Sequence, residues 1–352
     1  MATPYTTEGI QVLTLVEAIR KRPGMYIGGV DSFGLHNLIW NLVEPALVVA
    51  RNGQSLTTLD VELANEWLTV RHDGPELSVE TVDGTPVLAA LFTQFARRGM
   101  FVMPGCEPVI TCALSEAFEV ETHRDGERWI QSYHRGAEAG EVSSTGPSSA
   151  RGTQIRFRPD PTIFPSTTFD SMRIAERLQT LAWLTPQLAI RWQGERLLSR
   201  GGLAGWAEQR CAGECEIKLA LRREANPAAN VDSSNAVAVE VALAWRGAGE
   251  PIVRGFVDIT VTPHGQHVDA MWAGLAALAA RMSGTPVDEA RARAQLGPGL
   301  VALVRVTIPE PRFAGQTKEK LDSEIAGTAV ENTFAAVDIS PELRRFLLAR
   351  LL

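Results

Sequence analysis

Two cysteines stand four residues apart in the second half of the chain, Cys211 and Cys215. That spacing could bring two thiolates onto one metal ion, but a closed zinc site needs four ligands. No histidine lies nearby in the sequence, and the other cysteines, Cys106 and Cys112, are far away. We therefore interpret the four cysteines as structural thiols.

Three other side chains could move a proton or hold an anion. Glu44 stands within an apolar segment, Asp73 follows a predicted strand, and Lys318 lies in a charged turn. A positioned carboxylate can act as a general base, and a lysine ammonium can bind an anion. None of the three forms a motif by itself, so their meaning depends on the elements that carry them.

The composition sets the class of protein. The 352 residues suffice for two domains, each with its own core. Hydrophobic residues make up 45% and charged residues 21%, which is typical of a soluble globular protein. We see neither a long uncharged apolar run nor a secretory signal, so we expect a cytoplasmic protein. The net charge of −7 argues against a protein that coats DNA over its whole surface.

Apolar periodicity predicts the elements of the first half of the chain. We expect helices over residues 35–50, 110–118 and 169–182, and strands over 58–63, 67–72, 153–157 and 188–192, with a further strand beginning at 119. Residues 124–127 predict a hairpin turn. Residues 142–151 are rich in Ser, Gly and Pro and predict a loop.

The second half has a different composition, and we place the domain boundary near Arg210. Residues 224–235 predict a loop, and alternation over 237–245 predicts a half-buried strand. We expect residues 255–262 to pair with that strand. An Ala-rich helix over 268–282 and a strand over 301–308 should follow.

Several short motifs follow one another along the chain in a characteristic order. They are residues 20–28 (Arg-Lys-Arg-Pro-Gly-Met-Tyr-Ile-Gly), Gly34-Leu35-His36, Ala113-Leu114-Ser115, Gly152-Thr153, residues 155–159, Gly201-Gly202, residues 309–313 and residues 316–321. Together they resemble DNA gyrase B and its type IIA topoisomerase relatives in the GHKL ATPase superfamily. The resemblance covers essentially the whole chain.

The resemblance implies an α+β fold. A GHKL (Bergerat) ATPase-like sandwich, with an N-terminal dimer arm, should occupy residues 1–210. A smaller βαβ transducer-like domain should occupy residues 211–352. No segment resembles the cleavage (Toprim) domain of a full topoisomerase subunit, so we expect that domain to be absent.

In that family, the helix after the Gly-Leu-His turn carries a catalytic glutamate and, four residues later, an asparagine that ligates magnesium. Asn41 and Pro45 hold these positions here. A neutral amide has no usable basicity, and loss of a general base typically costs about 10²–10⁴ in rate. Pro45 offers no side-chain oxygen to magnesium, and its ring should kink the helix at Asn41 unless the bend is simply tolerated. We expect no catalytic residue and no metal ligand at these degenerate positions.

In that family, an aspartate at the end of a strand accepts a hydrogen bond from the adenine amino group. In the segment His72-Asp73-Gly74, His72 aligns with that aspartate. Asp73 should point to the opposite face of the strand, and a one-residue slip would reverse the whole face. The imidazole lacks the charge and reach of a carboxylate. We interpret the three residues as remnants of an ATP pocket.

The phosphate lid of the family is rich in glycine, and its amides wrap the phosphates. In the matching residues 101–107, only Gly105 survives. Thr153, Gln316 and Lys318 match further positions of the pocket, the last two in the transducer loop that reaches the terminal phosphate. A surface lysine and an ordinary strand threonine are the alternatives. Because the losses fall in one site, we expect neither ATP nor magnesium as a cofactor.

The family also exchanges an N-terminal arm across a two-fold dimer. Tyr5 and Ile10 fall at the positions that contact the partner's nucleotide and pack on the partner. An ordinary chain terminus is the alternative. An arm kept without its pocket favours a protein that assembles but does not hydrolyse ATP.

Three hypotheses follow. The first is a pseudo-ATPase that forms a homodimer or binds and modulates a gyrase or topoisomerase-type subunit. The second is a slow ATPase of a type II DNA topoisomerase that uses Glu44 or Asp73 as its base. The third is a small-molecule binder that reuses the old nucleotide cavity. Weak DNA contact through Arg281, Arg291 and Arg293 is a separate possibility.

Overall fold

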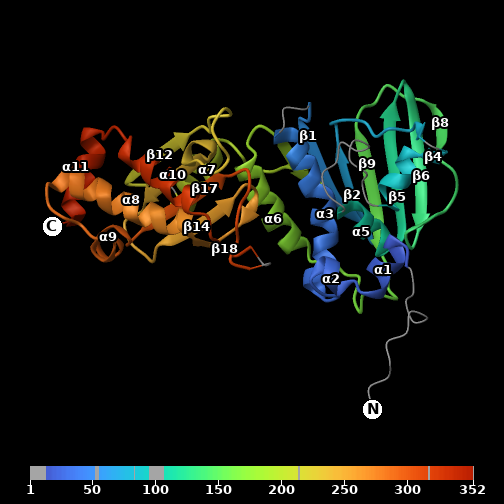
Figure 1. Ribbon diagram of the computed structural model, residues 1–352, viewed down its shortest axis with the longest axis horizontal. Coiled ribbons are helices and arrows are strands. Elements are labelled where there is room, and N and C mark those ends of the chain that lie inside the picture. Colours follow the sequence, from blue (N-terminus) through green and yellow to red (C-terminus); the bar gives the residue numbers. More distant parts are fainter. Residues whose placement is uncertain are drawn as a thin grey trace, which may run out of the picture. The chain divides into compact units, whose positions relative to one another are not determined.

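The computed structural model describes residues 13–51, 55–82, 84–94, 107–212, 215–315 and 318–351. The chain divides into two compact units, residues 1–198 and 199–352, each with its own sheet (Figure 1). The division falls before helix α7 (Gly202–Arg210), whereas the sequence predicted it after that helix. Trp206 of α7 packs on Phe256 with ring centroids 5.6 Å apart. This helix therefore belongs to the C-terminal unit.

The N-terminal unit contains a nine-stranded sheet in the order β11-β10-β1-β2-β9-β5-β6-β7, with β8 also paired to β6. The strands are β1 (Thr58–Ala64), β2 (Trp67–His72), β5 (Ser115–Arg124), β6 (Glu127–His134), β7 (Ala137–Glu138), β8 (Ser143–Pro147), β9 (Thr153–Pro159), β10 (Ala189–Trp192) and β11 (Glu195–Arg196). Strands β1 and β10 run parallel, and the other neighbours run antiparallel. A short hairpin, β3 (Thr81–Val82) and β4 (Thr85–Pro86), stands apart.

One face of this sheet is apolar. Leu68 and Val70 of β2 are buried, as are Phe118 and Val120 of β5. Helix α3 packs against β2 and α6 packs against β10 (Figure 1). The helices are α1 (Leu15–Lys21), α2 (Gly24–Ile27), α3 (Ser32–Arg51), α4 (Val87–Leu91), α5 (Glu107–Ala113) and α6 (Ser171–Leu184). The predicted mixed sheet with helices on one face is confirmed.

Helix α3 is the central helix of the unit. Its twenty residues run from Ser32 to Arg51 with Pro45 inside the helix. Residues 32–50 are long and apolar enough to cross a membrane, but 61% of the apolar stretch is buried inside the unit. That burial is typical of the core helix of a folded domain.

Two local predictions in this unit are wrong. The helix predicted over 110–118 ends at Ala113, and β5 begins at Ser115, because from Phe118 onward buried and polar side chains alternate along a strand. The loop predicted over 142–151 contains β8, whose backbone pairs with β6. An edge strand needs little apolar surface, so its Ser- and Gly-rich sequence concealed it.

The C-terminal unit contains a five-stranded sheet in the order β12-β13-β17-β14-β15. Its strands are β12 (Ile217–Arg223), β13 (Ala238–Trp245), β14 (Ile252–Val257), β15 (Thr260–Val261) and β17 (Leu300–Thr307); its helices, besides α7, are α8 (Gln266–Ser283), α9 (Glu289–Leu296), α10 (Glu324–Ala335) and α11 (Pro341–Leu351). Strands β14 and β17 are parallel, with α8 and α9 between them in the chain. This is the βαβ unit that was predicted.

The neighbours of β13 differ from the prediction. It pairs with β12 and β17, while β14 pairs with β17 and β15. The crossover through α8 and α9 brings β17 between the two strands that the sequence placed side by side. Both α7 and α10 contact β13, so this strand is buried on both faces along most of its length.

Candidate functional site

The segment before α3 is anchored by a buried carboxylate. Arg20 of α1 donates to the Asp160 carboxylate at 2.6 Å and to the Ala113 carbonyl at 2.7 Å. The Asp160 side chain is fully buried, and Arg135 approaches it at 3.3 Å. Burial raises the pKa of Asp160, but hydrogen bonds from Arg20 and Thr162 outweigh burial and leave it lowered. Arg20 therefore holds α1 against the end of β9.

The start of α3 is fixed by tight packing. His36 is buried; its Nδ1 donates to the Ser32 carbonyl at 2.6 Å, and its Nε2 accepts from the Asp170 amide at 3.0 Å. Asp170 caps α6, so this histidine links two helices. A Cβ on Gly34 would lie 1.9 Å from the Gly29 carbonyl oxygen. The glycine is thus required by the close approach of the loop before the helix.

One turn further along α3 lie the two positions that the sequence predicted to be degenerate. Asn41 is half-buried, and its Nδ2 has no hydrogen-bond partner in the described part of the chain. Pro45 is buried within the helix. The Glu44 carboxylate is 3.2 Å from the Arg177 guanidinium on α6. This turn therefore carries an unpaired amide, a proline ring and a carboxylate held by an arginine.

His72 ends β2 on the same face as Leu68 and Val70, with Thr153 of β9 opposite. Burial lowers its pKa to about 4, although the Asp73 charge acts in the other direction. The ring is therefore neutral near pH 7. Its Nδ1 accepts a hydrogen bond from the Gly74 amide at 3.2 Å. In a neutral imidazole the proton then resides on Nε2, which can only donate.

Asp73 turns back to the start of β1. Its Oδ1 accepts from the Thr57 and Thr58 amides, each at 2.8 Å, and its Oδ2 accepts from the Thr57 hydroxyl. Partial burial raises the pKa of Asp73, but these hydrogen bonds outweigh burial and lower it. Asp73 is thus a charged brace between the two strands.

Gly74 and Gly152 surround the end of β2. A Cβ on Gly152 would lie 1.9 Å from the His72 carbonyl oxygen, and Gly152 has φ +87°. A Cβ on Gly74 would lie 2.8 Å from Cδ1 of Leu56. These close approaches account for both glycines by packing alone.

Thr153 lies in the interior next to these glycines. It is 2% exposed, and its hydroxyl is 3.4 Å from the Thr122 hydroxyl. Thr122 in turn accepts from the Leu77 amide at 3.0 Å. Asn41, His72 and Thr153 are therefore residues of α3, β2 and β9 in the N-terminal unit, and each has a local structural environment.

The remaining predicted site residues are not placed with Asn41, His72 and Thr153. Tyr5, Ile10, Gly105 and Gln316 lie outside the described residues. Lys318 belongs to the C-terminal unit, where it is exposed, has φ +57° and donates its amide to the Gly315 carbonyl at 3.2 Å. The segment around it is joined through β18 (Lys320–Leu321) to β16 (His264–Gly265), which leads into α8.

The three arginines predicted as a basic cluster all make intramolecular contacts. Arg281 donates to the Ala335 and Val337 carbonyls at 2.6 and 3.0 Å, and Arg291 donates to the Leu351 carbonyl at 3.0 Å. Arg293 lies over the ring of Trp272, 4.6 Å from its centroid. These contacts join α8, α9 and the C-terminal helices, which gives each arginine a structural role.

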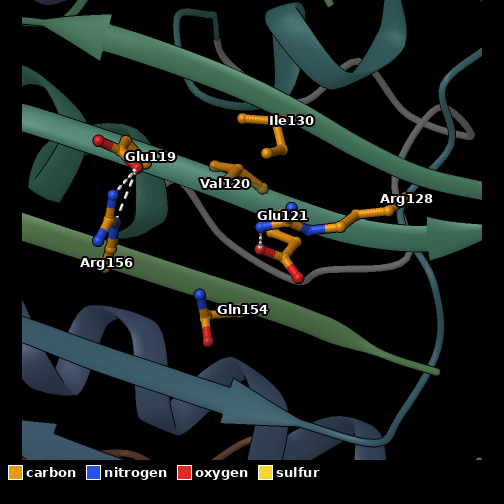
Figure 2. Close-up of a pocket in the computed structure, with 7 residues that line it drawn as sticks. All are labelled: Glu119, Val120, Glu121, Arg128, Ile130, Gln154 and Arg156. Atoms are coloured by element: carbon orange, nitrogen blue, oxygen red, sulfur yellow. Dashed lines mark hydrogen bonds and ion pairs between the residues drawn. The ribbon is translucent and has the colours of Figure 1, made fainter. Parts of the chain in front are cut away.

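The polar face of the N-terminal sheet carries a feature that the sequence reasoning missed. A hollow of about 160 Å³ is lined by Glu119, Val120, Glu121, Arg128, Ile130, Gln154 and Arg156 (Figure 2). Arg156 Nε donates to Glu119 at 2.7 Å, and Arg128 donates to Glu121 at 2.6 Å. The Arg128 hydrogen bond lowers the pKa of Glu121. Gln154 and Arg156 alternate with the buried Thr153 and Ile155, so this hollow and His72 lie on opposite faces.

The alternation of charged residues along β5, β6 and β9 was the available sequence signal for this hollow. Its acidic and basic groups are paired with each other, and the ion pairs close across neighbouring strands. The arrangement stabilises the exposed face of the sheet.

Comparison with known proteins gives a consistent result. A profile of the DNA gyrase B family matches residues 208–340. The DNA gyrase B protein of Archaeoglobus fulgidus is 32% identical over 94% of this chain and 55% of its own length, and that of Thermotoga maritima is 29% identical over 99% and 59%. The chain thus spans rather more than half the length of these relatives.

Two solved structures are similar over nearly their whole length. The 43K ATPase domain of Thermus thermophilus gyrase B, in complex with an aminocoumarin, has a TM-score of 0.80 and 25% identity, covering 96% of this chain and 94% of that one. The DNA gyrase B protein of Myxococcus xanthus has a TM-score of 0.80 and 27% identity, covering 96% and 99%. The chain is therefore similar to DNA gyrase B proteins in the region of their GHKL ATPase domain, and its residues 208–340 match the profile of that family.

Proposed function

We propose that this protein is a catalytically degenerate gyrase-B-like protein that does not hydrolyse ATP and acts by association. It forms a homodimer, or it binds and modulates a gyrase or topoisomerase-type partner. The observation that supports this most strongly is the chemistry of one turn of α3. Asn41 and Pro45 occupy the positions at which the family resemblance implies a general base and a magnesium ligand.

The missing base has no evident substitute in the described part of the chain. An amide cannot accept the proton of an attacking water, and loss of a general base costs about 10²–10⁴ in rate. Glu44, on the same turn, is held by Arg177 at 3.2 Å. Asp73 is occupied by hydrogen bonds from Thr57 and Thr58. These contacts disfavour the slow-ATPase hypothesis.

The adenine position supports the same conclusion. The family's aspartate accepts a hydrogen from the adenine amino group, whereas the free nitrogen of His72 carries a hydrogen itself. Two donors facing each other leave both unpaired, and an unpaired buried polar group costs about 1–3 kcal/mol. The lowered pKa of His72, about 4, excludes a useful charge on the ring near pH 7.

The magnesium position completes the proposal. Magnesium requires hard oxygen ligands in octahedral geometry. Pro45 has no side-chain oxygen, and its ring is buried in α3. One site therefore combines three substitutions, and each removes a different contact to Mg-ATP.

The surrounding frame supports a role for the shape itself. Arg20 still anchors α1 on the buried Asp160, and His36 still links α3 to α6. A stable frame around a chemically altered pocket suits a protein that works through its surface. Because its relatives are named as subunits of DNA gyrase, a gyrase-type subunit is the partner that we propose, in the cytoplasm.

Small molecules and DNA are weaker candidates. A similar structure is a complex with an aminocoumarin. At the position where the family resemblance implies a carboxylate that binds such a drug, this chain has His72. Arg281, Arg291 and Arg293 all make intramolecular contacts. Neither observation favours a second function.

Two measurements on the full chain test the proposal. In a phosphate-release assay with Mg-ATP, and with an active gyrase B protein as the positive control, we expect no turnover above the blank. In native mass spectrometry, alone and mixed with gyrase-type subunits, we expect a homodimer or a mixed complex that forms without nucleotide. Turnover, or a monomer under every condition, would refute it.

A further inference from the structure

Three polar side chains follow one another on the exposed face of the N-terminal sheet. Glu121 and His123 lie on β5 on either side of the buried Thr122, so both point to this face. Ser148 directly follows β8, and its amide donates to the Gly126 carbonyl at 2.8 Å. This hydrogen bond and the pairing of β8 with β6 place Ser148 beside the end of β5.

The distances join the three side chains end to end. Ser148 Oγ and His123 Nδ1 are 2.8 Å apart, and His123 Nε2 lies 3.1 Å from Glu121 Oε1. The side chains of His123 and Glu121 are 13% and 18% exposed, so water has limited access to them. A hydroxyl, an imidazole and a carboxylate in this order are the groups with which serine hydrolases make a nucleophile.

The surroundings of the serine and the imidazole decide where the hydrogens lie. The Ser148 Oγ accepts a hydrogen bond from the Ala150 amide at 3.2 Å. An ionised Glu121 can only accept, so the neutral His123 ring carries its hydrogen on Nε2 and leaves Nδ1 as an acceptor. The Ser148 hydroxyl therefore donates to Nδ1, and the imidazole is placed to take its proton.

Arg128 of β6 keeps the carboxylate ionised. Its guanidinium donates to Glu121 Oε2 at 2.6 Å, the oxygen that His123 does not approach (Figure 2). This hydrogen bond lowers the pKa of Glu121. A negative charge on Glu121 stabilises the imidazolium that forms when His123 takes a proton. Glu121 is thus a positioning residue, whereas His123 and Ser148 touch the reacting atoms.

We propose that Ser148 is a nucleophile, activated by His123, that takes an acyl group from an activated ester. Thr122 pairs with Thr153, which pairs with His72 on the buried face, so His123 lies on the other face of the sheet. The site is therefore independent of the proposed function. Failure of acylation leaves the ATP and association measurements untouched, and their failure does not affect this site.

The acylation step uses only these groups and the ester. The Ser148 Oγ attacks the carbonyl carbon of p-nitrophenyl acetate, and its hydrogen passes to His123 Nδ1. The bond from the carbonyl carbon to the phenolic oxygen breaks, and p-nitrophenolate leaves with the electron pair. The products are O-acetyl-Ser148, p-nitrophenolate and an imidazolium, which returns its proton to water.

The Ala150 amide limits the reaction to activated esters. It donates to the Ser148 oxygen, so it does not donate to the oxyanion of the tetrahedral intermediate. The lack of one such donor typically costs about 10²–10³ in rate. We therefore expect each chain to take one acyl group quickly from an activated ester and to release it slowly to water.

The sequence around Ser148 makes the test direct. The folded full chain is mixed with p-nitrophenyl acetate, and the release of p-nitrophenolate is followed by its absorbance. Trypsin cleaves after Arg135 and Arg151, so Ser148 falls on the peptide 136–151, and fragmentation of this peptide locates the acetyl group. We expect a burst of one equivalent of p-nitrophenolate and one acetyl group on Ser148. The chain unfolded in urea should show neither.

Matched variants test the nucleophile and the base. Ser148→Ala should abolish the burst, whereas Ser149→Ala, a change at the next residue of the same loop, should keep it. His123→Gln removes the general base and should slow the burst by about 10²-fold or more. Circular dichroism checks that each variant is folded.

Glu121→Gln tests the positioning role. We expect it to slow the burst by about 10-fold or more, and the nitrogen-15 spectrum of His123 should change from the Nε2–H form to a mixture of tautomers. A purely structural contact would leave both unchanged. The proposal is overturned if the acetyl group spreads over several serines, if Ser148 stays unmodified, or if folded His123→Gln reacts at the unaltered rate.

Discussion

Two neighbouring regions of the N-terminal unit resemble the same family but differ in which residues match it. In residues 20–37, the residues that resemble the family each make a defined structural contact: Arg20 with Asp160, Gly34 with the Gly29 carbonyl, and His36 with Asp170. At positions 41, 45 and 72, the residues differ from those that the family resemblance implies for the chemistry. The boundary between the two regions falls within a single helix, between His36 and Asn41.

The difference teaches which constraints act on each region. Removing a folding contact would destabilise the whole unit, so those residues cannot vary freely. Removing a general base or a metal ligand costs activity but leaves folding intact. If ATP turnover is no longer required, the residues of the second region are free to change, whereas those of the first region are not. The residues of the two regions differ in this way.

The largest expected effect is at a glycine beside the altered site. In Gly152→Ala, the new Cβ meets the His72 carbonyl oxygen at 1.9 Å. We expect the free energy of unfolding to fall by about 3 kcal/mol or more. Urea unfolding followed by circular dichroism measures it.

Gly126 offers a matched control. It also has positive φ, +76°, but nothing lies within 4 Å of its added Cβ. Gly126→Ala should therefore cost only the conformational term of about 1 kcal/mol. Equal losses in the two variants would show that Gly152 is not held by packing.

The next effect is a dependence of stability on pH through His72. Its folded pKa, about 4, lies below the ordinary value of 6.5. Between these values the unfolded chain binds a proton that the folded chain does not, so stability is full above pH 6.5 and falls as pH drops towards 4. We expect a loss of up to about 3 kcal/mol over that range.

Hydrogen exchange read separately in peptides of each unit measures this loss. The variant His72→Asn, which does not titrate, should flatten the acid limb in the N-terminal unit. Burial also lowers the pKa of His267 to about 4, partly offset by the Thr262 backbone, so His267→Gln should flatten the limb of the C-terminal unit. An unchanged acid limb in His72→Asn would mean that His72 is not buried as neutral imidazole.

A variant of Asp73 tests whether this residue has a structural role or binds nucleotide. Asp73→Ala removes the hydrogen bonds from Thr57 and Thr58, and we expect it to cost about 2 kcal/mol of stability. It should not change any binding of ATP measured by calorimetry. A loss of ATP affinity without a loss of stability would place Asp73 in a working pocket.

The smallest effect is expected at Asn41. Its Nδ2 is unpaired among the described residues, so Asn41→Leu should change stability by less than about 1 kcal/mol and leave phosphate release at the blank. On the same helix, Asn37 Nδ2 donates to the Ile27 carbonyl at 3.0 Å. Asn37→Leu should therefore cost more than Asn41→Leu, and the reverse order would argue for a bound partner at Asn41.

Local patterns predicted the elements that bear the site. The alternation over 67–72 placed β2 and put His72 on the face of Leu68 and Val70. The turn at residues 124–127 is also confirmed, with Asp125 and Gly126 at positive φ between β5 and β6. Both depend only on neighbouring residues, which is why periodicity and turn chemistry were sufficient.

Long-range pairings could not be predicted in the same way. The insertion of β17 between β13 and β14 depends on the crossover through α8 and α9, and the edge strand β8 is held by backbone hydrogen bonds that leave no apolar pattern. The bonds of Asp73 to Thr57 and Thr58 also join residues far apart in the sequence. The alternation of side chains predicted the face of the strand on which each residue lies, but not the hydrogen-bond partners of Asp73.

Calorimetric titration of the full chain with a non-hydrolysable ATP analogue and magnesium tests the central claim most directly. An active gyrase B protein serves as the positive control in the same buffer. We predict no saturable heat up to millimolar nucleotide, because neither adenine nor magnesium finds its ligands at His72 and Pro45. Saturable, magnesium-dependent binding at micromolar nucleotide would contradict the claim.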